Sequence, residues 1–281
     1  MISTFVPTIW DARLLAHLDK ALVYANLCNR DYEGEIRNYG DTVKINSISD
    51  IAVRDYKKGT PITTDDVDGT PTELKIDQQK YFSFKVEDID RVQANVNLVD
   101  AAMKRAAYAL ADMVDKHVAG LSAKAGVKVG SDASPVAINT ADKAYEALVD
   151  LRMALDEENV PTAGRFVVVP PWFYGNMLKD DRFVKAGTTK TDAVLAGGFI
   201  GSAAGFNIYQ SNNVPNTSKA KYKIVAGTQA AMSFAQQILN TEALRMESQF
   251  ADNVRGLLVF GSLVVQPKAL AVLTANPSEG R

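Results

Sequence analysis

The stretch RDYKKGTPITTDDVDGTPTE, residues 54–73, joins two segments that have the pattern of paired β-strands. Eight of its twenty residues are charged, and only Tyr56, Ile62 and Val67 offer substantial apolar surface. Long connections without structure of their own are uncommon, and they are usually functional or disordered. An arm this polar cannot bury itself against its own domain. We therefore expect it either to extend into solvent or to lie on another subunit.

The segments on both sides of this arm alternate between apolar and polar residues, as half-buried strands do. Before the arm, Val43 and Ile45 alternate with polar neighbours. After it, apolar residues of a single parity continue from Leu74 to Val86. The two segments together predict a long hairpin that buries one face.

Three other segments carry apolar residues at helical spacing. The first covers residues 10–26, and the third covers residues 141–157 and ends before Pro161. The second lies near 98–122 and would span about 35–40 Å at 1.5 Å per residue. Because this second segment is rich in alanine, a sheet can approach it closely, and we expect it to be the spine of its domain.

The remainder of the chain has the pattern of a mixed α/β block followed by strands. A turn-rich stretch at 126–140 marks a domain boundary, and a short helix is expected around 172–178. Strands are predicted at 166–169, 206–210, 222–225, 257–266 and 269–274. The last two predict a terminal hairpin. This order of elements indicates an α+β fold in which the chain leaves one region for a second and then returns.

Composition excludes several classes of protein. With 281 residues, 47% hydrophobic and 23% charged, the chain is expected to be globular with one or two domains. Its formal charge of −2 restricts any DNA contact to a weak or local one. The single cysteine, Cys28, excludes an intrachain disulfide and is interpreted as a small buried hydrophobe. Without a signal peptide or a membrane-length apolar tract, we expect a soluble cytosolic protein with no membrane partner.

No catalytic, metal-binding or cofactor-binding constellation stands out. His17 and His117 lack a second ligand at metal-binding spacing on their own elements. The glycine-rich run 196–205 does not match a phosphate loop, a dinucleotide motif or a nucleophile elbow, so we interpret it as tight turns. Carboxylate clusters occur at 65–68, 156–158 and 180–181. The first could hold a cation, but we interpret it as a solvated loop or a charge partner for a basic neighbour. We expect no metal, no cofactor and no enzymatic activity, although a small-ligand enzyme that uses the 196–205 loop remains an alternative.

Several stretches taken together carry a resemblance to a known family. They are IWDARLLAHLDKALVYANLCNRDYEGEI (9–36) running into GDTVKINSI (40–48), RFVVVPPWFYGNMLKDDRFV (165–184), GFNIYQSNNVP (205–215) and FADNVRGLLVFGSLVVQPKAL (250–270). With the polar hairpin and the spine helix between them, they make the chain resemble, over essentially its whole length, the major capsid (coat) proteins of tailed bacteriophages. That family has the Hong Kong 97-like shell fold.

The resemblance implies four parts. Residues 1–34 would be an N-terminal arm, 35–86 an extended loop over a neighbouring subunit, and 126–235 an axial domain near a ring centre. Residues 87–125 and 236–281 would form a peripheral domain around the spine helix. The implied function is self-assembly into pentamers and hexamers of an icosahedral head that encloses double-stranded DNA. The protein would be part of the virion after assembly in the host cytoplasm.

The resemblance also implies partners. They are further copies of the chain, a portal, packaged DNA held by weak non-specific contacts, and a separate scaffolding protein, because no long helical prodomain precedes the arm. Within the same fold, an encapsulin-type compartment shell is the alternative. Contacts between subunits, rather than one site, would carry the function. The candidate assembly residues are Trp10, Arg54, Tyr56, Lys57, Lys58, Asp65, Asp66, Asp68, Arg255 and Lys268.

Overall fold

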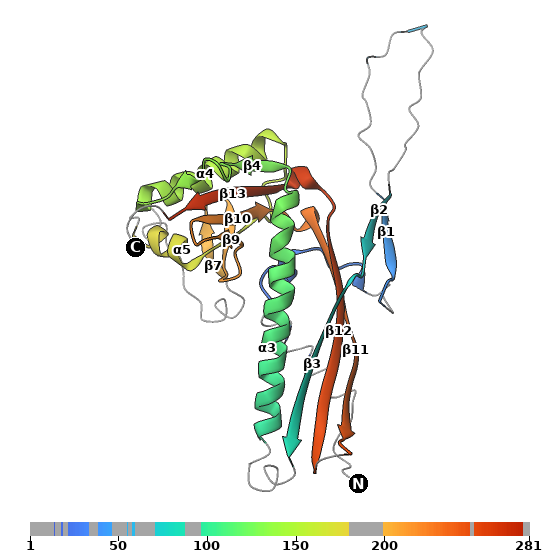
Figure 1. The fold of residues 1–281 in the computed structure, drawn as a ribbon. Coiled ribbons are helices and arrows are strands. Elements are labelled where there is room, and N and C mark those ends of the chain that lie inside the picture. Colours follow the sequence, from blue (N-terminus) through green and yellow to red (C-terminus); the bar gives the residue numbers. More distant parts are fainter. Residues whose placement is uncertain are drawn as a thin grey trace.

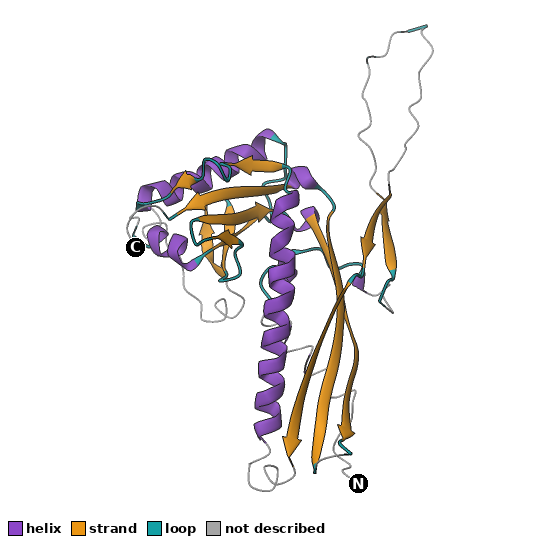
Figure 2. Cartoon of the chain, in the orientation of Figure 1, coloured by secondary structure: helices purple, strands orange, loops and turns teal. Residues whose placement is uncertain are grey.

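The molecule is elongated, with a long helix beside a narrow sheet and a wider sheet at one end (Figure 1). A two-stranded hairpin projects from the side of the narrow sheet, and the remaining helices border the wider sheet (Figure 2). The computed structural model describes residues 14, 18, 22–33, 39–46, 55, 58–59, 71–87, 97–179, 199–247 and 250–277.

The chain contains both helices and runs of consecutive strands, as an α+β fold does. The helices and 3₁₀ turns are η1 (Ala25–Leu27), α3 (Asn97–Ala119), η3 (Gly120–Lys124), α4 (Ala141–Glu157), α5 (Pro171–Met177), η5 (Gln229–Ala231) and η6 (Pro267–Ala269). The strands are β1 (Thr42–Asn46), β2 (Pro71–Lys75), β3 (Gln78–Glu87), β4 (Val127–Val129), β5 (Val136–Ala137), β6 (Phe166–Val169), β7 (Phe199–Ala203), β8 (Phe206–Gln210), β9 (Asn216–Thr217), β10 (Lys221–Gly227), β11 (Met232–Arg245), β12 (Ala251–Val264) and β13 (Leu270–Asn276).

Helix α3 packs along the antiparallel three-stranded sheet, in which β12 lies between β11 and β3. Val86 of β3 and Val254 of β12 meet Met103 of α3 in one apolar cluster. Nearer the end of the helix, the ring of Phe260 meets His117 edge-on at 5.3 Å. The predicted spine helix is confirmed, and it continues as η3 to Lys124.

The wider sheet has eight strands in the order β4-β13-β10-β6-β8-β7, with β5 paired to β13 and β9 to β10. Helix α4 lies against β13 and beside α5. The hydroxyl of Thr140 accepts the N–H of Lys143 at 3.4 Å, so it caps α4 at its first turn. The prediction of a helix over 141–157 is confirmed at both ends.

The predicted terminal hairpin is wrong. Strand β12 pairs with β11 and β3, whereas β13 pairs antiparallel with β10 and parallel with β4 and β5. Residues 266–269 therefore cross from one sheet to the other. Six of the seven residues of β13 are buried, which is typical of a strand covered on both faces. Residues 270–276 consequently share a sheet with strands of the 126–235 block.

The predicted pairing of strands around the polar arm is confirmed, with Thr42 opposite Lys75 and Asn46 opposite Pro71. Its apolar face packs on Ala235 and Val259 of the three-stranded sheet; that face consists of Val43, Ile45, Leu74 and Ile76. The single-parity run from Leu74 to Val86, however, is two strands in different sheets. Most of the arm, including residues 60–70, lies outside the described residues.

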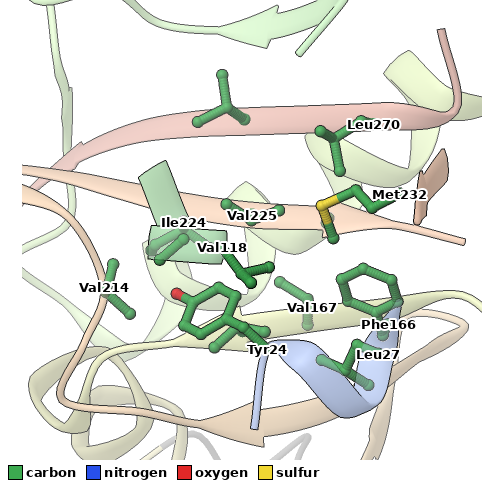
Figure 3. Packing of buried hydrophobic residues seen from close by; sticks show 14 of the residues in the cluster. Tyr24, Leu27, Val118, Phe166, Val167, Val214, Ile224, Val225, Met232 and Leu270 are labelled. Carbon is green, nitrogen blue, oxygen red and sulfur yellow. The ribbon is translucent and has the colours of Figure 1, made fainter. Parts of the chain in front are cut away.

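The largest core cluster joins the end of α3 to the eight-stranded sheet. Figure 3 shows Tyr24 of the N-terminal segment inside it. Leu14, Leu18 and Leu22 are buried, while most of the predicted 10–26 helix lies outside the described residues. Cys28 is buried, as the interpretation of a small hydrophobe predicted.

Candidate functional site

The described residues offer no catalytic arrangement. They contain no group of three or more His, Cys, Asp or Glu side chains that could hold a metal ion. Residues 199–210 form the β7–β8 hairpin, and its turn has positive φ at Ala204 (50°) and Gly205 (83°). The tight-turn interpretation is therefore confirmed for the described part of the glycine-rich run. No described helix is long and apolar enough to cross a membrane.

The carboxylates of 156–158 make structural ion pairs. Asp156 lies 2.7 Å from Nη2 of the buried Arg165, and Arg165 Nε also donates to the carbonyl of Pro161 at 2.9 Å. These contacts hold the loop between α4 and β6. The cluster at 65–68, expected to be solvated or paired with a basic neighbour, and the cluster at 180–181 lie outside the described residues.

His117 and Asp112 of the spine helix show no arrangement for acid–base catalysis. Burial lowers the pKa of His117, which favours the neutral imidazole. A hydrogen bond from Lys116 lowers the pKa of Asp112, which favours its ionised form. Neither group belongs to a cluster of possible metal ligands among the described residues.

The side of the three-stranded sheet that faces away from α3 is only partly covered by the described residues, and we call it the outer sheet face. Because strand residues alternate, Val254 and Leu258 point to the helix while Arg255 and Leu257 point outward. The chain's own β1–β2 hairpin covers one end of this face at Val259. The uncovered part consists of Tyr81, Ser83, Lys85, Glu242, Leu244, Asn253, Arg255 and Leu257.

The uncovered part is held in register by polar pairs across the strands. Arg255 Nε donates to Glu242 Oε1 at 2.6 Å, and the Ser83 hydroxyl donates to Asn253 Oδ1 at 2.7 Å. Tyr81, which is 76% exposed, stands opposite Leu257. Such exposed ion pairs contribute little to stability, so these charges are available for contacts with another molecule.

The predicted assembly residues do not gather at one place. Arg255 lies on the outer sheet face, and Lys268 is an exposed residue of η6, 3.9 Å from Glu158. Lys58 is exposed in a turn beside Gly59. The other predicted assembly residues lie outside the described residues: Trp10, Arg54, Tyr56, Lys57, Asp65, Asp66 and Asp68.

Exposed aromatic residues were missed by the sequence reasoning. The alternation that predicts Phe82 and Phe84 on the buried face also places Tyr81 on the open face, so a signal was available. Phe250, which is 84% exposed just before β12, has the parity of the buried Val254 and Leu258, so alternation predicts the wrong environment for it.

Comparison with known proteins gives a consistent result. The family described as "Phage capsid protein" matches residues 69–273. A structure from Mycobacterium phage Che8 is 33% identical in sequence, covers 90% of both chains and superposes with a TM-score of 0.70. No curated protein sequence matches the chain.

Two further structures share the fold at lower identity. The capsid structure of the cyanophage P-SCSP1u is 16% identical, covers 86% of this chain and 85% of its own, and gives a TM-score of 0.66. A virus-like particle from Pyrococcus furiosus is 16% identical, covers 95% of this chain and 98% of its own, and gives a TM-score of 0.59. At this identity the likeness shows the fold alone.

Proposed function

The chain belongs to the phage capsid protein family, and we propose that its copies assemble by laying the polar arm of one subunit, residues 54–73, over the outer sheet face of the next. Its role in the virion is structural, as a major capsid protein with the Hong Kong 97-like fold. Because capsid proteins of this family are not enzymes, the alternative of a small-ligand enzyme at 196–205 is set aside.

The observation that carries the proposal is the partial cover of the outer sheet face. The root of the chain's own hairpin already packs on Ala235 and Val259 of this face. The neighbouring stretch of the same face, around Tyr81 and Arg255, has no cover from the described residues. The arm of a neighbouring subunit, lying on that stretch, would extend the cover that the subunit's own hairpin already gives to this face.

Charge favours this occupant. The arm contains Asp65, Asp66 and Asp68, while the outer sheet face presents Arg255 and Lys85. Opposite charges across an interface fix register and partner choice more than they add affinity. Because the present partner of Arg255 is an exposed glutamate, an arriving carboxylate would exchange one exposed pair for another at little cost.

The contact is heterologous, since an arm on one copy meets a different surface on the next. Contacts of this kind close into rings when the rotation permits, which supports pentamers and hexamers as the building units of an icosahedral shell. The shell would enclose double-stranded DNA held by weak contacts, consistent with the formal charge of −2. A portal and a separate scaffolding protein complete the proposed partners.

The sheets support the division into domains, with two changes. The spine helix and the three-stranded sheet form the proposed peripheral domain, so β3 (78–87) joins this domain, with 1–34 as the N-terminal arm and 35–77 as the loop. The proposed axial domain is 126–235 together with 270–276, because β13 pairs with β10. The peripheral domain would then take 236–269 instead of 236–281.

Two arginines provide a matched test of the docking surface. Arg255 and Arg245 have side chains that are each 50% exposed, lie on adjacent strands and pair with a carboxylate, but they point to opposite faces of the sheet. We expect Arg255→Glu to fold normally and to give a several-fold lower shell yield, because the introduced glutamate would repel an acidic arm. Arg245→Glu is the control and is expected to assemble better than Arg255→Glu.

Shell yield, measured by sedimentation and electron microscopy, checks this expectation, and thermal unfolding shows that both variants fold. Equal shell yields from the two variants would show that the outer sheet face is not the docking surface. The contents of purified shells separate the two shell types: nucleic acid agrees with a phage head, and enclosed protein agrees with an encapsulin-type compartment.

A further inference from the structure

Residues 22–29 pass between the spine helix and the eight-stranded sheet. The N–H of Asn29 donates to the carbonyl of Met232 at 2.8 Å, and the N–H of Phe234 donates to the carbonyl of Asn29 at 2.9 Å. Tyr24 is fully buried in this segment. The labelled residues in its cluster in Figure 3 include Val118, Val167, Val214, Ile224 and Val225. The segment therefore fills the junction between the two sheets.

One side chain of the spine helix holds this segment in place. Asp115 Oδ2 accepts the N–H of Val23 at 2.8 Å. Its Oδ1 accepts the N–H groups of Tyr24 at 3.0 Å and Ala25 at 3.2 Å. Asp115 is only 2% exposed. Three consecutive backbone N–H groups thus donate hydrogen bonds to one carboxylate, which is almost inaccessible to water.

The charge of Asp115 has no cationic partner among the described salt bridges. Asp112, one turn earlier, has a like charge, and its own partner is Lys116 at 2.6 Å. On the segment, burial raises the pKa of both Tyr24 and Cys28, so both groups stay neutral in acidic and neutral solution. Arg30 is the described cation that acts on Cys28. Among the described residues, only backbone dipoles therefore balance the carboxylate.

We infer that Asp115 is a positioning residue that fastens the N-terminal segment to the spine helix, and that release of the segment is coupled to loss of a proton from its carboxyl group. While the segment is seated, the carboxyl group is dry, and burial disfavours its ionised form. When the segment leaves, the same group lies on a helix surface in water, where ionisation is less costly. This inference does not depend on where the arm docks.

The direction of the pH dependence follows from the two states. Burial raises the pKa of Asp115 from 3.8 to about 6, even though the three backbone hydrogen bonds lower it. Proton binding therefore stabilises the seated state fully below pH 3.8, and this stabilisation is lost as the pH rises through about 6. The ratio of released to seated segment should increase about tenfold per pH unit between these limits, about a hundredfold in total, and then level off.

Cys28 provides the readout, because it is the only cysteine in the chain and lies buried in the same segment. The full-length chain is treated with dithiodipyridine, a disulfide reagent that reacts at acidic pH, from about pH 4 to 8. Each rate is divided by the rate of the urea-unfolded chain at the same pH, which removes the titration of the thiol itself. We expect the normalised rate to rise about a hundredfold by pH 6 and then to stay constant.

Two variants assign this rise to one group. Asp115→Asn keeps the shape and one acceptor oxygen but cannot titrate, so its normalised profile should be flat between pH 4 and 6. Asp112→Asn removes the like charge and leaves Asp115 in place, so it should retain the rise. The inference would be overturned if the normalised rate of Asp115→Asn rose between pH 4 and 6 as in the wild type. It would also be overturned if the normalised wild-type rate stayed constant or fell.

Hydrogen exchange keeps the test decisive if Asp115→Asn does not fold. In the wild-type chain, we expect hydrogen exchange of a peptide over 22–29, corrected for intrinsic exchange, to have the same pH profile as the normalised rate of Cys28 modification. Exchange of the β6 peptide should not follow it, because the eight-stranded sheet stays folded. Parallel changes in both peptides would mean global unfolding and would contradict a local release.

Discussion

At the scale of single residues, one glycine determines how the hairpin leaves the three-stranded sheet. A Cβ added to Gly261 of β12 would lie 2.2 Å from the carbonyl oxygen of Lys75 and 2.9 Å from Cδ1 of Ile76. Only a residue without a side chain permits this approach of two backbones. Gly261 therefore lets the connection between β2 and β3, at Lys75 and Ile76, pass directly against the backbone of β12.

Substitution of this glycine should destabilise the subunit. Gly261→Ala must displace the backbone at Lys75, and we expect it to lower the free energy of unfolding by about 1–3 kcal/mol. Gly120→Ala is the control, because a Cβ at Gly120 meets nothing within 4 Å. Urea unfolding compares the two variants. Equal midpoints would show that the contact at Gly261 relaxes without cost.

Asp115 illustrates what residue patterns could not reveal. The apolar spacing of the 98–122 segment predicts which positions face the core, and Val114 and Val118 are buried as expected. The same pattern says nothing about Asp115. Its burial depends on residues 22–29, about ninety positions earlier in the chain, lying across the helix. A contact so distant in sequence leaves no local signal.

At the scale of elements, helices were predicted more accurately than strand partners. A helix makes its hydrogen bonds within one segment, so the apolar spacing over 141–157 and Pro161 after it were sufficient to predict α4. A strand must find a distant partner. The pairing of β13 with β10, and of the short β4 and β5 with β13, therefore could not be read from the segments themselves.

Helix α4 offers a test of the core beneath it. Leu151 is fully buried, and Leu151→Ala is expected to lower the free energy of unfolding by about 2–5 kcal/mol through the cavity that it leaves. Met153, on the same helix, is 51% exposed, and Met153→Ala should change stability by less than about 0.5 kcal/mol. Denaturant unfolding measures both values. Similar losses would contradict the packing of α4 described here.

At the scale of the whole molecule, the described subunit has surfaces that suit other copies. A two-stranded hairpin is only marginally stable by itself, and β1–β2 forms a separate sheet that projects from the side of the three-stranded sheet (Figure 1). The outer sheet face beside its root carries the exposed Tyr81 and an exposed ion pair. The polar arm of 54–73 and this face are the two halves of the contact that we propose between neighbouring subunits.

Electron microscopy of the purified full-length chain, compared with a variant that lacks residues 57–71, tests this central claim most directly. We predict closed icosahedral shells from the full-length chain, with density for the arm of one subunit over Tyr81 and Arg255 of the next. The deletion variant should remain folded but form no shells, because its docking contact is gone. Normal shells from the deletion variant, or arm density that avoids this face, would contradict the account.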